Sequence, residues 1–513
     1  MKSVFSAQEK YQATLRDLFP EAELPTKIGE IVVNGIALDS RKVQQGGLFI
    51  ALVGARVDGR KFIPQVIENG VAAVFTEAEY FSIEMHGDVP VINVPSLLFR
   101  VGMLASRFYG KPSQTLDVIG VTGTNGKSTS VSLLAQCFTL LKKPAWQLGT
   151  TGYGNPGVGL VDTGLTTPDP ISCQEVLVEA NKASVEVVAM EVSSHAVVQH
   201  RISGIKFKGG VLTNVTHDHL DFHGSFESYR TAKKSFFKFH DMEFAIVNLD
   251  DSLGLEIASE GLGEQVKVIS YSTRNSEADV FAEIETVDLN GMQGILNTPW
   301  GSGQFSTQLA GEFNLSNLLA TISVMCEMGE SFAEVLSVLP RLEPVQGRLQ
   351  RVENNIEGAD APQVFVDYAH TPDALKNALS TMKDLTIGKL WVVFGCGGDR
   401  DKGKRSVMGE IASEHADCVV ITSDNPRGED AQKIIQDIEA GIDSQKGYRA
   451  IVDRREAIEF AIQGLEKNDC LLIAGKGHER YQLIGEKKLP FDDYLIARDA
   501  LSLRHKAVTG EAT

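Results

Sequence analysis

Residues 118–129 constrain the fold of this chain more than any other stretch. They read Val-Ile-Gly-Val-Thr-Gly-Thr-Asn-Gly-Lys-Ser-Thr and join a short apolar run to an apolar helical pattern over residues 131–141. A strand that breaks into a glycine loop and continues as a helix offers backbone N–H groups and a helix N-terminus to an anion. The pattern therefore predicts an α/β unit whose loop cradles a polyphosphate.

The end of this loop carries the side chains that nucleotide chemistry needs. A lysine at position 127 can reach the outer phosphates, and the Ser128 hydroxyl can hold Mg²⁺. Only two residues separate Gly123 from Gly126, whereas the common phosphate-loop pattern has four residues before its Gly-Lys pair. We therefore expect a variant phosphate loop. The alternative, an ordinary glycine turn, leaves the flanking strand and helix unexplained.

Length and charge exclude several classes of protein. With 513 residues, the chain should hold more than one domain. The formal net charge of −18 argues against nucleic-acid binding, which needs a basic surface. No apolar run approaches the roughly 18 residues of a membrane span, and the polar, mixed-charge N-terminus does not resemble a secretory signal. We expect a cytoplasmic globular protein without a membrane span.

The cysteines favour a reducing compartment. None of the six forms a C-x-x-C pair, and four lie in or beside apolar runs. Such cysteines are typically buried thiols rather than disulfides or metal ligands. Cys396 lies inside a glycine-rich loop, which leaves a reactive thiol as the alternative at that position.

Three regions separate along the chain. We expect a small N-terminal α/β domain at residues 1–100, a central phosphate-loop domain with a mainly parallel sheet at 101–348, and a C-terminal Rossmann-like, doubly wound domain at 349–513. Short alternating stretches with Gly and Asn turns predict a β-rich patch at 266–308, and a helical pattern follows at 314–328. Further short buried strands are expected at 47–54, 72–75, 89–94, 185–192, 210–213 and 244–247.

The C-terminal region repeats one theme, in which an apolar run ends in polar or glycine-rich residues. The runs at 364–367, 390–394, 418–422 and 470–474 are followed by Tyr368–His370, Gly395–Arg400, Asp424–Arg427 and Gly475–Glu479. Continuous apolar runs are typical of a sheet buried on both faces. In open α/β sheets the carboxyl ends of the strands carry the ligand site, so these four endings should line one site.

Two groups in the central region suggest metal chemistry. Glu191 ends an apolar strand, where a carboxylate can ligate the Mg²⁺ of bound ATP; a solvated glutamate is the alternative. His217, His219 and His223 place three of the chain's 11 histidines within a few residues. These residue types permit zinc, but the spacing fits no simple zinc motif. One histidine with carboxylates suits Mg²⁺, and we interpret His223 as an ordinary loop residue.

Taken together, these motifs resemble those of the Mur ligases, the ATP-dependent amino-acid-adding enzymes of peptidoglycan synthesis. The resemblance covers nearly the whole chain and rests on the combined set of motifs, not on the phosphate loop alone. It implies an ADP-forming amide ligase with ATP as co-substrate and Mg²⁺ as cofactor. The matching stretches are Gly123–Ser128, Glu191–His195, Asn214–Asp221, Gly311–Asn314 with Asn317, Gly347–Arg348 and Asp367–His370.

The resemblance also implies roles for single residues. The ATP-binding residues would be Gly123, Thr124, Asn125, Gly126, Lys127, Ser128, Thr129, Asn314, Asn317 and Arg348. The catalytic residues would be Lys127, Glu191, His219, Lys233 and Asp367, the last ordering a water or the closed state. The metal ligands would be Ser128, Glu191, His219 and Lys233.

Lys233 matches a lysine that is carbamylated by CO₂ in the family. Carbamylation turns a cation into an anionic oxygen ligand for a metal ion. By itself, a lysine in the run Thr231-Ala232-Lys233-Lys234 is more often a solvated helix residue. Lys234 is the neighbouring candidate, but the spacing from His219 favours Lys233.

Within the family, the chain resembles the enzymes that add the third residue to UDP-N-acetylmuramoyl-L-alanyl-D-glutamate. Residues that would bind this precursor are Leu38, Ser40, Ala55, Arg56, Val57, Thr166, Thr167, Ser193, Gln199 and Arg201. Residues that would bind meso-2,6-diaminopimelate are Arg400, Asp424, Asn425, Pro426, Arg427, Gly475 and Glu479. Leu165 is a departure, because some relatives have a hydrogen-bonding asparagine there.

The chemistry of diaminopimelate agrees with these roles. It is lysine with a second amino-acid head at its far end, so its extra carboxylate calls for a guanidinium fork such as Arg427. Its extra ammonium calls for a carboxylate such as Glu479. The alternative for residues 424–427 alone is a type I turn, in which Asp, Asn and Pro are common.

Two other functions remain open from the sequence. A folate polyglutamate ligase of the same superfamily would share the acyl-phosphate chemistry but lack the first domain with Asp39-Ser40-Arg41. A nucleotide switch that is not a ligase would explain the phosphate loop but not the four C-terminal strand endings. We expect small-molecule substrates and a monomer.

Overall fold

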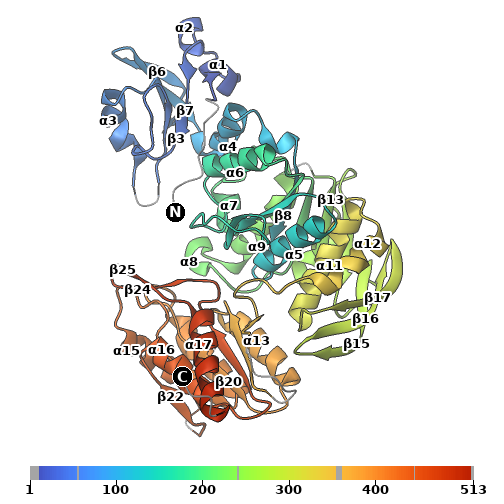
Figure 1. Cartoon of the computed structure of the whole chain (residues 1–513). Helices are drawn as coiled ribbons and strands as arrows, with labels where there is room; N and C mark the ends of the chain where they lie inside the picture. The colour runs from blue at the N-terminus through green and yellow to red at the C-terminus, as the bar shows by residue number, and fades with distance from the viewer. Residues whose placement is uncertain (1–10, 55–56, 240–241, 354–360, 444, 510–513) are drawn as a thin grey trace.

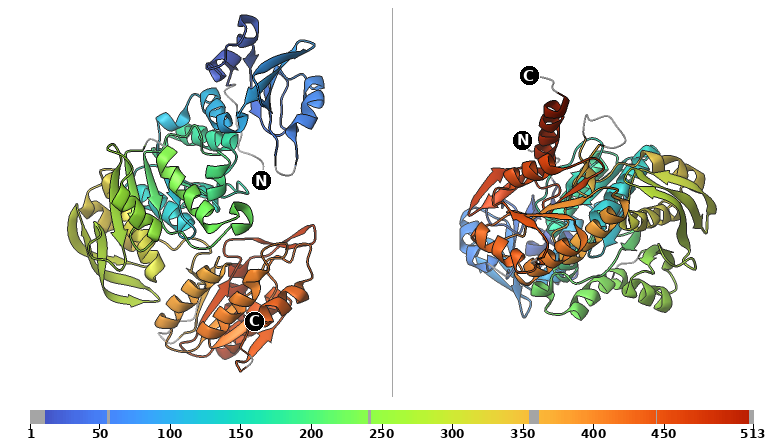
Figure 2. Two further views of the ribbon diagram at one scale, coloured as in Figure 1. Left: turned by 180° about the vertical axis from the view of Figure 1, so that it is seen from behind. Right: turned by 90° about the horizontal axis from the view of Figure 1, so that it is seen from below.

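The computed structural model describes residues 11–54, 57–239, 242–353, 361–443 and 445–509. These residues form three α/β domains in a row, with the central domain between the other two (Figure 1). The view from behind shows the same order (Figure 2). The predicted fold class is therefore confirmed. No helix in these ranges combines the length and the apolar character needed to cross a membrane.

The N-terminal domain is built on a five-stranded sheet in the order β3-β4-β5-β7-β6. β4 (Leu48–Ala51) is buried along its whole length, as its apolar run predicts. β6 (Ser82–His86) is a largely exposed edge strand, antiparallel to β7, and its polar sequence did not predict it. The other elements are β1 (Ala13–Thr14), α1 (Leu15–Leu18), α2 (Thr26–Gly29), β2 (Val32–Val33), β3 (Ile36–Ala37), α3 (Ile63–Glu68), β5 (Ala73–Ala78) and β7 (Val89–Pro95).

The central domain holds a ten-stranded sheet in the order β10-β9-β11-β8-β12-β13-β14-β15-β16-β17. The strand order reverses at β8 (Asp117–Thr122), so the carboxyl end of β8 is the kind of switch point where α/β folds bind ligands. The phosphate loop lies there and leads into α5 (Lys127–Leu140). Val118 packs into the core on one face of the sheet and Ile119 into the core on the other, so β8 is covered from both sides.

The remaining elements of this domain include those that carry the other predicted site residues. They are α4 (Leu97–Phe108), β9 (Ala145–Gly149), β10 (Gly152–Gly154), α6 (Pro170–Lys182), β11 (Val187–Glu191), α7 (Ser194–Val198), β12 (Gly209–Leu212), α8 (Leu220–His223), α9 (Phe226–Phe239), β13 (Phe244–Asn248), α10 (Ser252–Glu260), β14 (Lys267–Ser272), α11 (Glu312–Glu327) and α12 (Phe332–Val338).

The predicted β-rich patch is an extension of the central sheet. β15 (Val280–Asp288), β16 (Gly291–Thr298) and β17 (Gly301–Thr307) form an antiparallel meander at its edge. The β15–β16 turn reaches the third domain, where Leu289 packs against the core and Asn290 Oδ1 accepts a hydrogen bond of 3.0 Å from Arg351 NH1. The meander thus links the central and C-terminal domains.

The C-terminal domain has a six-stranded sheet in the order β18-β19-β23-β20-β21-β22. The strands are parallel except β18, and Val364 and Phe365 of β19 pack into cores on opposite faces, as continuous apolar runs predict. The polar hairpin β24–β25 was not predicted. The elements are β18 (Gln350–Arg351), β19 (Gln363–Asp367), α13 (Pro372–Leu385), β20 (Leu390–Phe394), α14 (Gly403–His415), β21 (Cys418–Ile421), α15 (Ala431–Glu439), β22 (Tyr448–Ala450), α16 (Arg454–Gly464), β23 (Cys470–Ala474), β24 (Tyr481–Ile484), β25 (Lys487–Pro490) and α17 (Asp493–Thr509).

Candidate active site

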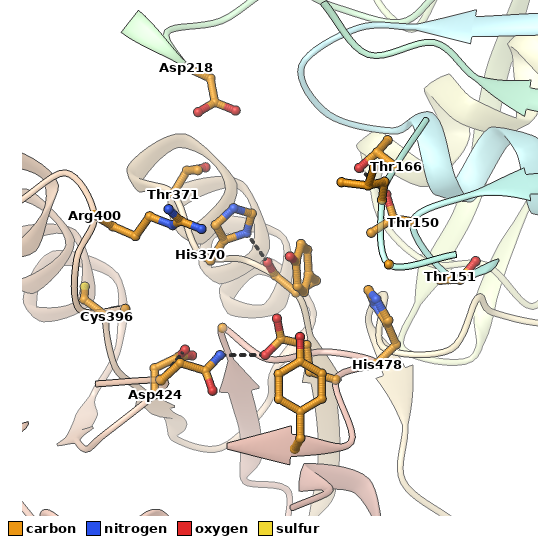
Figure 3. Close-up of a pocket in the computed structure, with 18 of the residues that line it drawn as sticks. Thr150, Thr151, Thr166, Asp218, His370, Thr371, Cys396, Arg400, Asp424 and His478 are labelled. Carbon is orange, nitrogen blue, oxygen red and sulfur yellow. Dashed lines mark hydrogen bonds between the residues drawn. The ribbon is translucent and has the colours of Figure 1, made fainter. Parts of the chain in front are cut away.

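A cleft of about 1930 Å³ lies between the central and C-terminal domains. Thr150, Thr166 and Asp218 line it from the central domain, and Arg400 and Asp424 line it from the C-terminal domain (Figure 3). The strand endings after β19, β20, β21 and β23 all contribute to the wall of the cleft, the first through Tyr368 and His370. The expectation that these four endings line one site is confirmed.

The phosphate loop is held in a conformation that needs glycine. Gly126 has a φ of +85°, and a Cβ atom there would lie 2.4 Å from Asn317 Oδ1. The Lys127 ammonium donates hydrogen bonds of 2.8 Å to the carbonyl oxygens of Gly123 and Thr124. Burial lowers the pKa of Lys127, and the Glu191 carboxylate opposes that shift. The loop thus holds its lysine close to the groups that a phosphate would contact.

Glu191 is buried at the end of β11, with 1% of its surface exposed. One carboxylate oxygen accepts a hydrogen bond of 2.8 Å from the Thr150 backbone N–H, and the other lies 3.2 Å from the Thr150 hydroxyl. Both carboxylate oxygens therefore contact neutral donors of Thr150. The alternative of a solvated strand-end glutamate does not fit this burial.

The two candidate lysines on α9 have different environments. Lys233 is 1% exposed, donates a hydrogen bond of 2.6 Å to Gly123 O, and lies 4.7 Å from the centre of the Tyr229 ring. Burial, followed by the nearby Lys127 charge, lowers the pKa of Lys233 well below its ordinary value. Lys234 instead pairs with Glu256 and Glu260. Lys233 therefore faces the phosphate loop, and Lys234 faces a carboxylate pair on α10.

The histidines of the 214–223 segment form an aromatic group beside the cleft. His219 adopts a left-handed φ of +53°, and its ring nitrogen Nε2 lies 3.3 Å from Asp218 Oδ2. The His195 ring packs 4.8 Å from that of His219, and His223 Nε2 lies 2.9 Å from the Ser194 hydroxyl. Within the described ranges, no three His, Cys, Asp or Glu side chains gather as a metal site would require. The zinc alternative gains no support from this geometry.

Residues from the segment between the last two domains reach back to the phosphate loop. Arg348 NH2 lies 3.3 Å from Ser128 Oγ, and its guanidinium stacks 4.6 Å from the Tyr368 ring. Arg348 Nε is buried and has no hydrogen-bond partner among the described residues, which leaves a donor for a ligand. Asp367 accepts hydrogen bonds from the backbone N–H groups of Leu349 and Ala369, at 2.6 and 2.8 Å.

Asp367 therefore stabilises the segment between the central and C-terminal domains. Burial raises the pKa of its carboxyl group, and the neighbouring Arg348 opposes the shift. Of the other predicted nucleotide-binding residues, Asn314 donates a hydrogen bond of 2.8 Å to Ala310 O at the start of α11. Asn317 lies against the phosphate loop, 3.3 Å from the Ser130 hydroxyl.

The predicted amino-acid pocket is assembled from three strand endings. Arg427 has a left-handed φ of +50°, and its NH1 donates a hydrogen bond of 2.9 Å to Gly398 O. Asn425 Nδ2 donates a hydrogen bond of 2.8 Å to Glu479 Oε2. Gly475 has a φ of +117°, and a Cβ there would lie 2.8 Å from Asp424 Oδ2. Strained backbone at a non-glycine residue such as Arg427 is typical of functional sites.

The predicted precursor-binding residues divide between two places. Arg201 donates to Thr167 O at 2.8 Å and to Gln199 Oε1, while the Ser193 backbone N–H donates to Thr167 Oγ1 at 3.1 Å. Thr166 lies beside them and lines the cleft. Leu38, Ser40 and Val57 belong to the N-terminal domain and do not line this cleft, and Ala55 and Arg56 lie outside the described residues.

The cysteines are free thiols, of which five are buried and Cys418 is half-buried. The prediction of buried thiols is confirmed for those five. Cys396 lines the cleft, but burial raises the pKa of its thiol to about 12. Since the thiolate is the reactive form, a nucleophilic role for Cys396 is disfavoured.

Sequence reasoning missed several residues that hold the site together. Asp373, in the first turn of α13, accepts hydrogen bonds from Asn125 Nδ2 at 3.0 Å and from the Thr216 hydroxyl at 3.3 Å. An acidic residue in a first helical turn is usually part of the cap, so its sequence gave no signal of an inter-domain contact. Lys476 was also missed, although it lies inside the Gly475–Glu479 stretch.

Comparison with known proteins defines the class of this protein. The chain matches the family descriptions "Mur ligase family, catalytic domain" over residues 32–109, "Mur ligase middle domain" over 121–325 and "Mur ligase, glutamate ligase domain" over 347–477. It therefore belongs to the Mur ligase family.

Individual relatives and solved structures show which named proteins this chain is similar to. A Chromobacterium violaceum protein named UDP-N-acetylmuramoyl-L-alanyl-D-glutamate--2,6-diaminopimelate ligase is 43% identical over 473 residues, or 92% of this chain and 94% of that protein. A solved structure with the same name has a TM-score of 0.71 at 34% identity, covering 96% of this chain and 99% of the other. Folylpolyglutamate synthase of Mycobacterium tuberculosis, complexed with ADP and AMPPCP, has a TM-score of 0.59 at 16% identity, covering 80% and 94% of the two chains. That last likeness is one of fold alone.

Proposed function

We propose that this protein joins meso-2,6-diaminopimelate to UDP-N-acetylmuramoyl-L-alanyl-D-glutamate, with ATP as co-substrate, in the synthesis of peptidoglycan precursors. The observation that carries the proposal is the composition of the cleft. Asp218 and His219 of the central domain line the same cavity as Arg400, Arg427 and Glu479 of the C-terminal domain. An amino-acid-adding ligase needs groups that act on the phosphate of ATP and a charged pocket that binds the incoming amino acid.

The reaction proceeds in two displacements. A γ-carboxylate oxygen of the precursor's D-glutamate attacks the γ-phosphorus of ATP, the bond to the β-phosphate oxygen breaks, and ADP leaves with that electron pair. The neutral amino group of diaminopimelate then attacks the acyl carbon, and inorganic phosphate leaves as the C–O bond breaks. The nitrogen releases one proton as the amide forms. The protein aligns these groups and neutralises their charge.

Cationic side chains near the phosphate loop supply the charge for the first displacement. Lys127 would contact the outer phosphates, and Arg348 would add a second cation beside Ser128. Asn314 and Asn317 would hold adenosine or its phosphates. Closure of the C-terminal domain over the cleft would exclude water from the acyl phosphate.

The donor set near the loop suits Mg²⁺. The Ser128 hydroxyl and the Glu191 carboxylate are oxygen donors of the kind that hard cations prefer, and His219 would complete the set. Bound there, Mg²⁺ neutralises phosphate charge. The Lys233 ammonium lies 2.6 Å from Gly123 O and, as a cation, cannot ligate a metal ion. Lys233 would therefore be a metal ligand only when it is carbamylated.

The proposed substrates also suggest the oligomeric state and the cellular location of the enzyme. Residues of one chain supply the phosphate loop, the precursor-side residues around Arg201 and the amino-acid pocket around Arg427. A monomer is therefore sufficient for the reaction, and we propose one. Nucleotides and amino acids carry charges that keep them in the aqueous cytoplasm, where we place the enzyme.

The folate polyglutamate ligase is disfavoured. The chain has the additional N-terminal domain with its own five-stranded sheet, and its likeness to folylpolyglutamate synthase is limited to the fold. A nucleotide switch without ligase chemistry is excluded by membership of a family of ligases.

The test is phosphate release from ATP in the presence of Mg²⁺. We expect sustained release only when both the UDP precursor and diaminopimelate are present. Release that instead required a folate and glutamate would establish the alternative ligase, and release independent of any acceptor would contradict the proposed reaction.

A further inference from the structure

A buried lysine lies directly behind the amino-acid pocket. Lys476 follows β23, is fully buried, and does not line the cleft. Its ammonium donates hydrogen bonds of 3.1 Å to Asn425 Oδ1 and 3.0 Å to Glu479 Oε2. It also lies 5.7 Å from the centre of the Tyr481 ring. Lys476 thus contacts two residues that line the cleft without lining it itself.

The contacts of Asn425 determine how its amide group is oriented. Its Oδ1 receives two donors, the Lys476 ammonium and the Leu483 backbone N–H at 2.9 Å, while its Nδ2 donates to Glu479. A rotated amide would place its NH₂ group against those two donors. Among the described residues Nδ2 has Glu479 as its acceptor, so its second N–H is left for a ligand, and Asn425 lines the cleft.

Glu479 is arranged in the same way. Its Oε2 accepts hydrogen bonds from both Asn425 and Lys476, so Oε1 is the oxygen left for a ligand. The Asn425 donor and the Glu479 acceptor are therefore kept side by side by one ammonium. A carboxylate and an ammonium on the same carbon, as in an amino-acid head, match such a donor and acceptor pair.

We infer that Lys476 is a positioning residue that sets the specificity of this pocket for an amino-acid head group. It holds Asn425 as a donor and Glu479 as an acceptor without touching the ligand. The inference rests on the proposed function, because it concerns the far head of diaminopimelate.

Stability alone does not account for a lysine at this position. A buried ion pair contributes little more to folding than apolar side chains of similar volume, and often less. Without the ammonium, by contrast, Asn425 loses the charge that orients its amide and Glu479 loses the cation beside it. The consequence falls on the binding of the amino acid.

The main test compares Lys476→Met with Lys383→Met. Lys383 is a matched control, since it bonds to Asp417 at 2.6–2.7 Å in the same domain but on the surface. For Lys476→Met, the KM for diaminopimelate should rise by roughly tenfold to a hundredfold, the size of a lost charge-assisted contact. The KM values for ATP and for the UDP precursor should stay within about twofold, and Lys383→Met should behave as wild type.

A second comparison separates positioning from a general structural role. In an Asn425→Ala/Glu479→Gln background, adding Lys476→Met should not raise the KM for diaminopimelate further, because the groups through which Lys476 acts are gone. A further rise of the same size as in the wild-type background would overturn the inference. Thermal unfolding of each variant shows whether the fold is intact.

Asn425→Asp tests the amide orientation even if Lys476→Met does not fold. It replaces the N–H donor by an acceptor and should raise the KM for diaminopimelate at least tenfold. An unchanged KM would overturn the inference. If wild-type enzyme does not use diaminopimelate, the proposed function fails and the inference with it. If wild type uses it and Lys476→Met keeps the wild-type KM, only the inference fails.

Discussion

Lys233 shows how burial changes the chemistry of one amine. Its environment lowers its pKa well below the ordinary value, so more of it is neutral at a given pH than for a solvated lysine. CO₂ reacts with the neutral amine, and the carbamate supplies the anionic oxygen that a hard cation prefers. Carbamylation should therefore increase as the pH rises through the lowered pKa.

We predict that Lys233→Ala binds the UDP precursor but is almost inactive. Acetate or formate should restore part of the rate, because a small carboxylate can replace the missing carbamate. Lys234→Ala should show neither effect, since Lys234 pairs with Glu256 and Glu260 and points away from the loop. Steady-state rates with and without added acid provide the measurement. Rescue of Lys234→Ala instead would place the modification one residue later, and full activity of both variants would remove it from the mechanism.

A second prediction concerns the binding of diaminopimelate by Arg427. If its guanidinium binds the distal carboxylate of diaminopimelate, Arg427→Ala should lose about 1.5–3 kcal/mol of binding, or roughly tenfold to a hundredfold in KM. The KM for ATP should hardly change, because the phosphate loop lies on the other domain. Equal changes in both KM values would mean that the substitution disturbs the fold rather than one contact.

The buried His478 should make the stability of the folded protein depend on pH. Burial, together with the nearby Arg348 charge, lowers its pKa to about 4, so the imidazole is neutral in the folded protein near pH 7. In the unfolded chain it takes up a proton below about pH 6.5. Its contribution to stability is therefore fully present above pH 6.5 and is lost as the pH falls from 6.5 towards 4.

His478→Gln should remove this part of the pH dependence. We expect the urea midpoint of wild type, measured relative to that of His478→Gln, to decrease between pH 6.5 and 4.5 and to be constant from 6.5 to 8. A difference that does not vary with pH would show that His478 is equally protonated in both states.

The β8–loop–α5 element and the end of β11 form the phosphate-activating unit. Lys127→Ala and Glu191→Ala should each reduce acyl-phosphate formation by at least about a thousandfold, since charge at the γ-phosphate is left without its partner. Precursor-dependent ADP formation in a single turnover is the readout. Unchanged Mg²⁺-dependent turnover of Glu191→Ala would exclude its carboxylate from the site, and stoichiometric zinc in the purified protein would revive the zinc alternative.

Elements were predictable where the local pattern and the tertiary structure agree. The apolar runs that became β8, β11 and the C-terminal strands are buried on both faces, so composition alone marks them. The edge strand β6 and the hairpin β24–β25 carry polar side chains on exposed surfaces, and their strand character depends on pairing with a neighbour. Local sequence therefore gave little sign of them.

At the scale of the whole molecule, contacts between domains were the part that the sequence did not reveal. The residues within one motif, such as 424–427, are close in sequence and were predicted together. The hydrogen bond from Asn125 to Asp373 joins residues far apart in the chain, and so does that from Arg348 to Ser128. Such contacts depend on how whole domains pack, which no local pattern encodes.

The arrangement of domains also explains why the chemistry needs both the central and the C-terminal domain. The cleft of about 1930 Å³ lies between two domains, with Thr150, Asp218 and His219 on the central-domain side and the amino-acid pocket on the C-terminal side. An acyl phosphate formed on one side must be shielded from water before an amine from the other side reaches it. Substrate-driven closure is the expected solution.

The central claim is that the cleft selects an amino acid with two head groups. The most direct measurement incubates the enzyme with ATP, Mg²⁺ and UDP-N-acetylmuramoyl-L-alanyl-D-glutamate, with either meso-diaminopimelate or L-lysine at equal concentration, and identifies the product by mass spectrometry. We predict the diaminopimelate-containing product, with kcat/KM on the order of a hundredfold above that for lysine, which leaves the distal pocket charges unpaired. Comparable turnover of L-lysine would contradict the assignment.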